Sequence, residues 1–176
     1  MKSPAEAYFA TLAEIRATGG GVKETSYYPA LINLLDAVGE TLKPRVRAVS
    51  QLKNTGAGSP DAGLYAANQF AKGASEPLPG QLPERGAVEI KSVAEDGWLT
   101  ANSAQVSQYW EKYRLVLVSN YRDFVLVGRD TAGQMVPLEG LQLAASEAEL
   151  IDLLRQPRQA AARFGDRLLD FLARAL

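Results

Sequence analysis

The sequence contains no cysteine and no histidine among its 176 residues. Without these side chains the chain cannot build a zinc finger, a thiol nucleophile, a Ser-His-Asp triad, a His-Asn-His nuclease centre or an imidazole metal site. Any hydrolytic chemistry must therefore rest on carboxylates, lysine, tyrosine or a hard metal ion.

The sequence also lacks a long apolar run and an excess of one charge. No run approaches the roughly 20 residues that a membrane span needs, and the start Met-Lys-Ser-Pro-Ala-Glu has no signal-peptide segment. We therefore expect a cytoplasmic chain without a membrane partner. Because DNA affinity comes mainly from Lys and Arg on phosphates, a net charge of -1 predicts weak DNA binding by this chain alone.

Apolar residues at helical spacing predict several helices. The first covers residues 4–18, with Ser3 as a cap, and the second lies between Ser26 and Lys43. A third begins at Asn102 or Ser103 and runs to about Lys112. Two more are expected over residues 146–155, opened by a capping box, and 159–174.

Strands are expected between these helices, at residues 45–52, 61–65, 87–93, 115–118 and 124–127. Residues 66–86 hold several Gly and Pro and predict neither helix nor sheet, so they form either a disordered hairpin tip or a DNA clamp. The interleaving of strands and helices predicts an α/β fold in one domain of ordinary size.

The best candidate for a reaction centre combines Asp61, in Gly58-Ser59-Pro60-Asp61, with Glu89 and Lys91 of a later strand. Because side chains alternate along a strand, Val88 and Ile90 suit an apolar interior while Glu89 and Lys91 project together from the other face. Two carboxylates supply the hard oxygen ligands of Mg²⁺, and a lysine can orient or deprotonate a water.

These residues carry a resemblance. Pro60-Asp61, Glu89-Ile90-Lys91 and the helical pair Gln105 and Tyr109 resemble the motifs of the PD-(D/E)xK nuclease superfamily. The resemblance implies a restriction-endonuclease-like fold, in which a central mixed β-sheet is flanked by helices, with C-terminal helices added. Three further segments are similar to the N-terminal nuclease domain of large single-chain restriction-modification enzymes: residues 24–31, 58–65 and 116–124.

The resemblance also implies roles for individual residues. Asp61 and Glu89, together with Glu24 just before the second helix, would bind Mg²⁺. Asp61, Glu89, Lys91 and Gln105 would be catalytic, and Tyr109 would contact the DNA. Arg47 and Lys53 flank the predicted site in the sequence and are further candidates for phosphate contacts.

The resulting prediction is a Mg²⁺-dependent DNA endonuclease domain that hydrolyses phosphodiester bonds in double-stranded DNA. Residues 1–145 would form the nuclease domain, and residues 146–176 would be C-terminal helices that start a connector. The resemblance implies that an N6-adenine DNA methyltransferase and a target-recognition domain belong to the same longer chain.

Other interpretations remain open. The chain could be a catalytically silent DNA-binding or docking module of the same fold, although the presence of Asp61, Glu89 and Lys91 argues against this. It could also be a stand-alone, structure-selective nuclease, but such an enzyme needs a basic groove of its own, and a net charge of -1 leaves few excess cations to form one. Individually, Glu89 and Lys91 could form an exposed ion pair, Asp61 a turn and Glu24 a helix-start acid.

Overall fold

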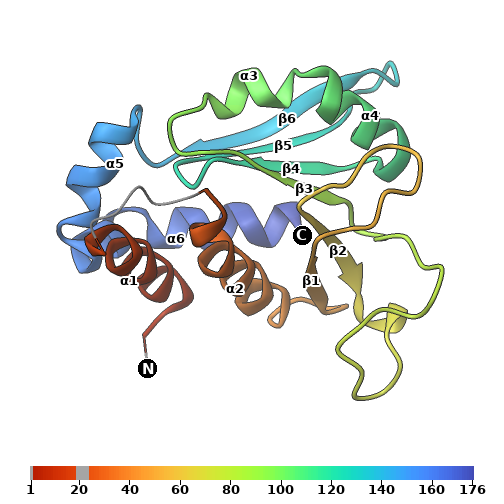
Figure 1. The fold of residues 1–176 in the computed structure, drawn as a ribbon, viewed down its shortest axis with the longest axis horizontal. Coiled ribbons are helices and arrows are strands. Elements are labelled where there is room, and N and C mark those ends of the chain that lie inside the picture. The colour runs from red at the N-terminus through yellow and green to blue at the C-terminus, as the bar shows by residue number, and fades with distance from the viewer. Residues whose placement is uncertain (1, 19–23) are drawn as a thin grey trace.

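The computed structural model describes residues 2–18 and 24–176, which form a six-stranded mixed sheet (Figure 1). The strands lie in chain order, and only β3 and β4 run parallel to each other. Their bounds are β1 Val46–Ser50, β2 Ala62–Ala66, β3 Ala87–Ile90, β4 Val116–Ser119, β5 Asp123–Arg129 and β6 Met135–Gln142. The predicted α/β class is therefore confirmed, and β3 lies inside the sheet.

Helices cover both faces of this sheet (Figure 1). One face packs against α1 Pro4–Ala17, α2 Tyr28–Gly39 and α6 Pro157–Ala175, with α5 Glu147–Leu154 beside α1 and α6. The other face packs against α3 Gly97–Ala101 and α4 Ala104–Tyr113, the crossover between β3 and β4. Short 3₁₀ helices span Glu24–Tyr27 and Ala67–Gln69. Among the described helices, none has the length and apolar character needed to cross a membrane.

Serine caps begin three of the helices where the sequence predicts them. Ser3 forms a capping box with Glu6 at α1, Ser103 accepts a hydrogen bond from the N–H of Val106 at α4, and Ser146 caps α5. Such caps satisfy backbone donors that would otherwise lack partners in the first turn.

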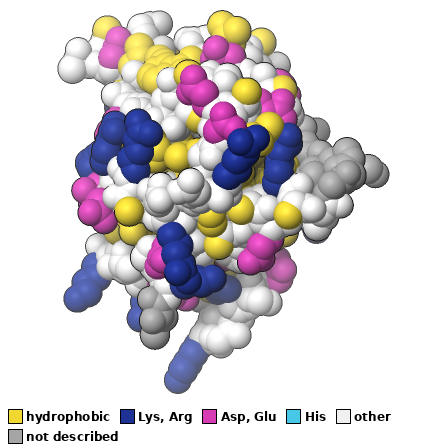
Figure 2. Space-filling model, turned by 90° about the vertical axis from the view of Figure 1, so that its left-hand side faces the viewer, with side chains coloured by type: hydrophobic (Ala, Val, Ile, Leu, Met, Phe, Trp, Pro, Cys, Tyr) yellow, Lys and Arg dark blue, Asp and Glu magenta, His cyan; other side chains and the backbone are white. Residues whose placement is uncertain are grey.

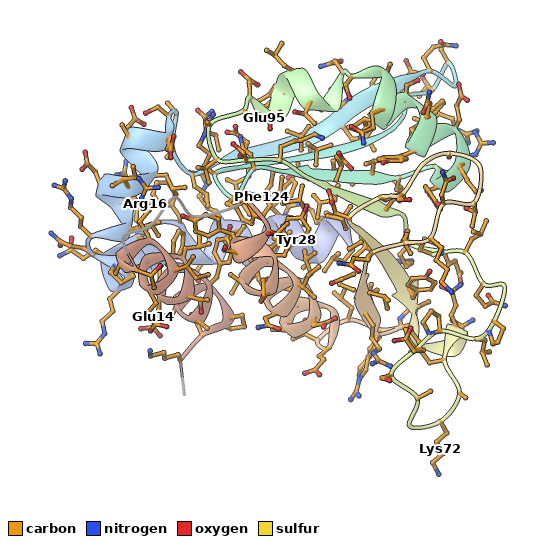
Figure 3. The ribbon with its side chains drawn as sticks, in the orientation of Figure 1. Glu14, Arg16, Tyr28, Lys72, Glu95 and Phe124 are labelled. Atoms are coloured by element: carbon orange, nitrogen blue, oxygen red, sulfur yellow. The ribbon has the colours of Figure 1, made fainter. Side chains whose placement is uncertain are left out.

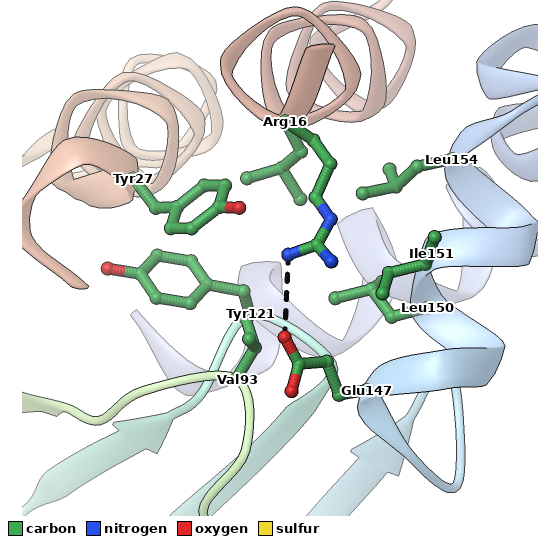
Figure 4. Close-up of a pocket in the computed structure, with 9 residues that line it drawn as sticks. Arg16, Tyr27, Val93, Tyr121, Glu147, Leu150, Ile151 and Leu154 are labelled. Atoms are coloured by element: carbon green, nitrogen blue, oxygen red, sulfur yellow. Dashed lines mark hydrogen bonds and ion pairs between the residues drawn. The ribbon is translucent and has the colours of Figure 1, made fainter. Parts of the chain in front are cut away.

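The C-terminal helices share the core of the N-terminal ones. Leu150 of α5 and Phe164, Leu168 and Phe171 of α6 belong to the same apolar cluster as the α1 side chains. An ion pair of 3.4 Å between Arg16 and Glu147 closes a small apolar pocket between α1 and α5 (Figure 4). That these helices start a connector to further domains stays a prediction.

Two elements, α3 and β6, were not predicted. Glycine obscures both: Gly97 begins α3, and β6 contains Gly140 as well as Pro137. Gly140 is packed under the ring of Trp98, where an added Cβ would lie 2.3 Å from a ring carbon. A register shift between Leu126 and Val127 further disturbs the alternation that would mark β6 as a strand.

The long connection between β2 and β3 is held together by Gln69. Its side-chain oxygen accepts hydrogen bonds from the N–H groups of Ala66 and Glu84, both at 3.1 Å, and its side-chain nitrogen donates to Gln81 and Leu82. The connection also contains a β-bridge between Phe70 and Pro77. The Gly- and Pro-rich segment is therefore a loop held together by its own hydrogen bonds.

Candidate active site

Glu89 and Lys91 form an ion pair at the end of the central strand β3. Val88 and Ile90 belong to the core beneath α1 and α2, so Glu89 faces α4. The Lys91 Nζ lies 2.8 Å from Glu89 Oε1, and the Glu89 side chain is only 3% exposed. An exposed surface pair does not describe this arrangement, because the acid is enclosed by protein.

Asp61 approaches the pair from the start of the neighbouring strand β2. Its Oδ2 accepts a hydrogen bond of 2.7 Å from the backbone N–H of Ile90, which links it directly to β3. Its Oδ1 accepts a second bond, also of 2.7 Å, from the Tyr28 hydroxyl at the start of α2. Figure 3 shows Tyr28 between α2 and the sheet. Asp61 is therefore fixed from two sides.

A chain of hydrogen bonds leads from Lys91 along α4. Lys91 Nζ donates to Gln105 Oε1 at 3.2 Å, and Gln105 Nε2 donates to the Tyr109 hydroxyl at 3.0 Å. An ammonium group can only donate, so the Gln105 amide must turn its oxygen toward Lys91 and its nitrogen toward Tyr109. The four-residue spacing places Gln105 and Tyr109 on one face of α4, as predicted.

The same helix also supports the loop that precedes Asp61. Gly58 adopts a φ of +94°, and a Cβ added there would lie 3.2 Å from the Tyr109 ring. Further along α4, Lys112 Nζ donates to the carbonyl of Thr55, and the Thr55 and Tyr113 hydroxyls are 3.4 Å apart. One helix thus contacts both segments of the site.

The enclosure changes the proton affinities of these groups. Burial raises the pKa of Glu89 to about 7; the hydrogen bond from Lys91 opposes this rise, and the charge of Asp61 adds to it. Burial lowers the pKa of Lys91, but the hydrogen bond and charge of Glu89, with smaller effects of Glu95 and Asp61, leave it above its ordinary value. Burial likewise raises the pKa of Tyr109, so its hydroxyl stays protonated at neutral pH.

Five of the predicted site residues therefore come together: Asp61, Glu89, Lys91, Gln105 and Tyr109. The side chain of Glu24 lies outside the described part of the chain, so its metal role stays a prediction.

The two predicted phosphate contacts lie in β1 and in the loop before Asp61, and their role stays a prediction. The Arg47 guanidinium stacks 4.2 Å from the centre of the Phe70 ring and donates to the Ala74 carbonyl at 2.8 Å, so it holds the loop after β2. Lys53 is exposed in the loop before Asp61, where it lines a groove with Tyr65 and Tyr113.

The sequence did not predict the contact between Tyr28 and Asp61. A tyrosine at a helix start carries no signal for a partner 33 residues later, and Tyr28 entered the sequence argument only within the segment 24–31.

The donor atoms of the site suit Mg²⁺. Among the described side chains, those of residues 2–18 and 25–176, no group of three or more acidic side chains is arranged around a common point. Mg²⁺ does not require one, because it keeps several waters and is commonly held by one or two carboxylates and substrate phosphates. Asp61 and Glu89 offer those carboxylates, and a cation between them would offset the cost of placing two acids together.

The chain resembles a known protein in its fold. No family model matches the chain, and no curated protein matches its sequence. Among solved structures, it is similar to a chain in the cryo-EM structure of a DrdV–DNA complex, with a TM-score of 0.57 and 18% sequence identity. The match covers 88% of this chain and 94% of that chain. The shared architecture is consistent with a restriction-endonuclease-like fold, which confirms the predicted fold class.

Proposed function

We propose that this chain is a Mg²⁺-dependent DNA endonuclease domain of the PD-(D/E)xK type. The observation that carries the proposal is the connected group at the end of β3, where Asp61, Glu89 and Lys91 meet and α4 holds Lys91 through Gln105. The similar solved chain belongs to a complex with DNA, which supports DNA as the substrate.

Asp61 and Glu89 would hold the ion in this proposal. When bound, Mg²⁺ supplies Lewis-acid polarisation of a phosphoryl oxygen and lowers the pKa of a coordinated water. Lys91 holds a positive charge beside the scissile phosphate and orients the attacking water. Gln105 fixes the direction of the Lys91 ammonium, and Tyr109 fixes the Gln105 amide. The groups are therefore preorganised for the charge that develops in the transition state.

The geometry favours this proposal over a silent module of the same fold. A docking module has no need for a carboxyl that is 3% exposed beside a second acid, because burying charge costs free energy. Association with a methyltransferase and a target-recognition domain remains part of the proposal. The presence or absence of methyltransferase and target-recognition sequences in the native protein would test it directly.

The test is cleavage of duplex DNA with Mg²⁺ by the native full-length protein and two variants. Asp61→Ala should abolish cleavage, because it removes one of the two carboxylates. Lys91→Ala should lower the cleavage rate by roughly 10²- to 10³-fold, the cost of losing one preorganised charge-stabilising group, with little change in DNA binding.

Lys72→Ala is the matched control for the lysine. It removes the same charge from the loop after β2, where Lys72 points away from the body of the molecule (Figure 3), and should leave the rate unchanged. A parallel loss of DNA affinity in Lys91→Ala would make Lys91 a phosphate anchor. Full cleavage by Asp61→Ala would overturn the proposed function.

A further inference from the structure

The hydroxyl of Tyr28 is bonded to one oxygen of Asp61, and the two residues come from different layers of the fold. Tyr28 is the first residue of α2, whereas Asp61 precedes β2 in the sheet. The hydroxyl donates to Asp61 Oδ1 at 2.7 Å while the Ile90 N–H occupies Oδ2 at the same distance. Each oxygen of the carboxylate therefore has a donor of its own, and the plane of the carboxylate is fixed.

From this contact we propose that Tyr28 is a positioning residue of the metal site, which holds Asp61 in the orientation that binds a divalent cation beside Glu89. The inference rests on the proposed function. A carboxylate oxygen can accept more than one interaction, so the bond from Tyr28 leaves lone pairs of Asp61 available for the ion. Without the hydroxyl, the Asp61 carboxylate loses one of its two 2.7 Å hydrogen bonds and is held less firmly.

The alternative is that the bond merely attaches α2 to the sheet. The packing of α2 argues against this role. Leu31, Leu34 and Leu35 are each at most 2% exposed and lie in the main core, and Asp36 accepts a 2.7 Å hydrogen bond from the N–H of Ala48 in β1. These contacts already attach the helix to the sheet, so the Tyr28 hydroxyl is not needed for docking.

The test compares Tyr28→Phe with Tyr27→Phe in the native full-length protein. Tyr27 and Tyr28 are adjacent, and each variant lacks one tyrosine hydroxyl. The Tyr27 ring packs against Tyr121, 5.2 Å between centroids, and its hydroxyl is not among the groups that hold Asp61. Mg²⁺ binding is measured by calorimetry without DNA, thermal unfolding is measured without metal, and cleavage is followed over a range of Mg²⁺ concentrations.

Tyr28→Phe should raise the apparent dissociation constant for Mg²⁺ on the order of tenfold, the cost of one hydrogen bond to a charged group. Its cleavage should recover at high Mg²⁺, and its unfolding temperature should stay within about 5 °C of that of Tyr27→Phe. Tyr27→Phe should bind Mg²⁺ as the parent does.

Two results would overturn the inference. Unchanged Mg²⁺ affinity in Tyr28→Phe would show that the Tyr28 hydroxyl does not orient Asp61 for metal binding. A fall in unfolding temperature at unchanged affinity would make the contact a structural attachment. Both results presuppose that the parent protein binds Mg²⁺ and cuts DNA; a parent that does neither would refute the proposed function instead.

Discussion

Glu89 illustrates how a single residue acquires its properties from its surroundings. Its side chain is enclosed between β3 and α4, with Lys91 on one side and Asp61 nearby. Burial favours the neutral acid, and this preference is stronger than the stabilisation that the lysine gives to the charged form. In the metal-free protein, Glu89 therefore changes its charge near neutral pH, which has consequences for stability.

The first prediction concerns that charge. The folded-state pKa of Glu89, about 7, lies above its ordinary value of 4.5, so the unfolded chain loses the proton first as pH rises. The contribution of Glu89 to stability should therefore fall between about pH 4.5 and 7 and stay low above pH 7. Glu89→Gln removes this dependence, so its free energy of unfolding relative to the parent should rise across the same window.

Urea unfolding in the presence of a chelator, repeated at several pH values, measures this difference. Glu14→Gln, on the exposed side of α1, is the control and should show a much smaller trend. A pH-independent difference between parent and Glu89→Gln would mean that the acid is charged throughout.

Some contacts between the residues of the site can be predicted from the sequence, and others cannot. Glu89 and Lys91 lie two residues apart at the end of β3, and Gln105 and Tyr109 share a helix face, so their short spacings predict their proximity. The bond between Tyr28 and Asp61 joins an α2 residue to a sheet residue, and no local pattern encodes such a contact. Arg47 was proposed as a phosphate contact from its nearness in sequence; its guanidinium contacts Phe70 and the Ala74 carbonyl, and a DNA contact stays a prediction.

At the scale of elements, α4 organises the site. Its residues contact Lys91 at one end and the loop before Asp61 at the other, so the helix sets the relation between these two segments. The sequence predicted α4 and its cap because apolar spacing and Ser103 are local signals. It missed α3 and β6, whose Gly97, Pro137 and Gly140 weaken the patterns that mark a helix or a strand.

The second prediction tests the contact between α4 and Gly58. Gly58→Ala should destabilise the protein by about 1–2 kcal/mol, because an L residue disfavours positive φ. It should also lower the cleavage rate, because the new methyl group lies 3.2 Å from the Tyr109 ring and displaces it. Chemical unfolding and DNA cleavage measure the two effects.

Gly73→Ala provides the matched control. Gly73 also has a positive φ, +77°, but no other atom lies within 4 Å of its added Cβ. This variant should lose comparable stability and keep its cleavage rate. Equal rates for the two variants would show that the position of Tyr109 does not matter for catalysis.

Over the whole molecule, positive and negative charges nearly balance. The net charge is -1, and the face in Figure 2 shows Lys and Arg interspersed with Asp and Glu. Composition alone predicted this balance. The order of the strands was less accessible, because the parallel pairing of β3 with β4 depends on a crossover that covers one face of the sheet, and only the assembled fold shows β3 inside it.

The third prediction follows from the charge. The 176-residue chain should bind duplex DNA no better than the roughly 10⁻⁴ to 10⁻⁶ M of non-specific binders, with a shallow dependence on salt. A titration of labelled duplexes at several salt concentrations measures this affinity. Nanomolar, sequence-dependent binding would show that the chain reads DNA itself and needs no attached domain for site selection.

The pairing between β2 and β3 is short. Ala62 pairs with Val88 and Gly63 with Ala87, and Leu64 adds backbone hydrogen bonds to Arg85 and Gly86, whereas β1 and β2 pair over five residues. Asp61 and Glu89 stand on opposite sides of this narrow joint. The distance between the two acids therefore depends on how closely the hairpin of β1 and β2 packs against β3. A shift of the hairpin relative to β3 would therefore change the distance between the two carboxylates on which the proposed metal site depends.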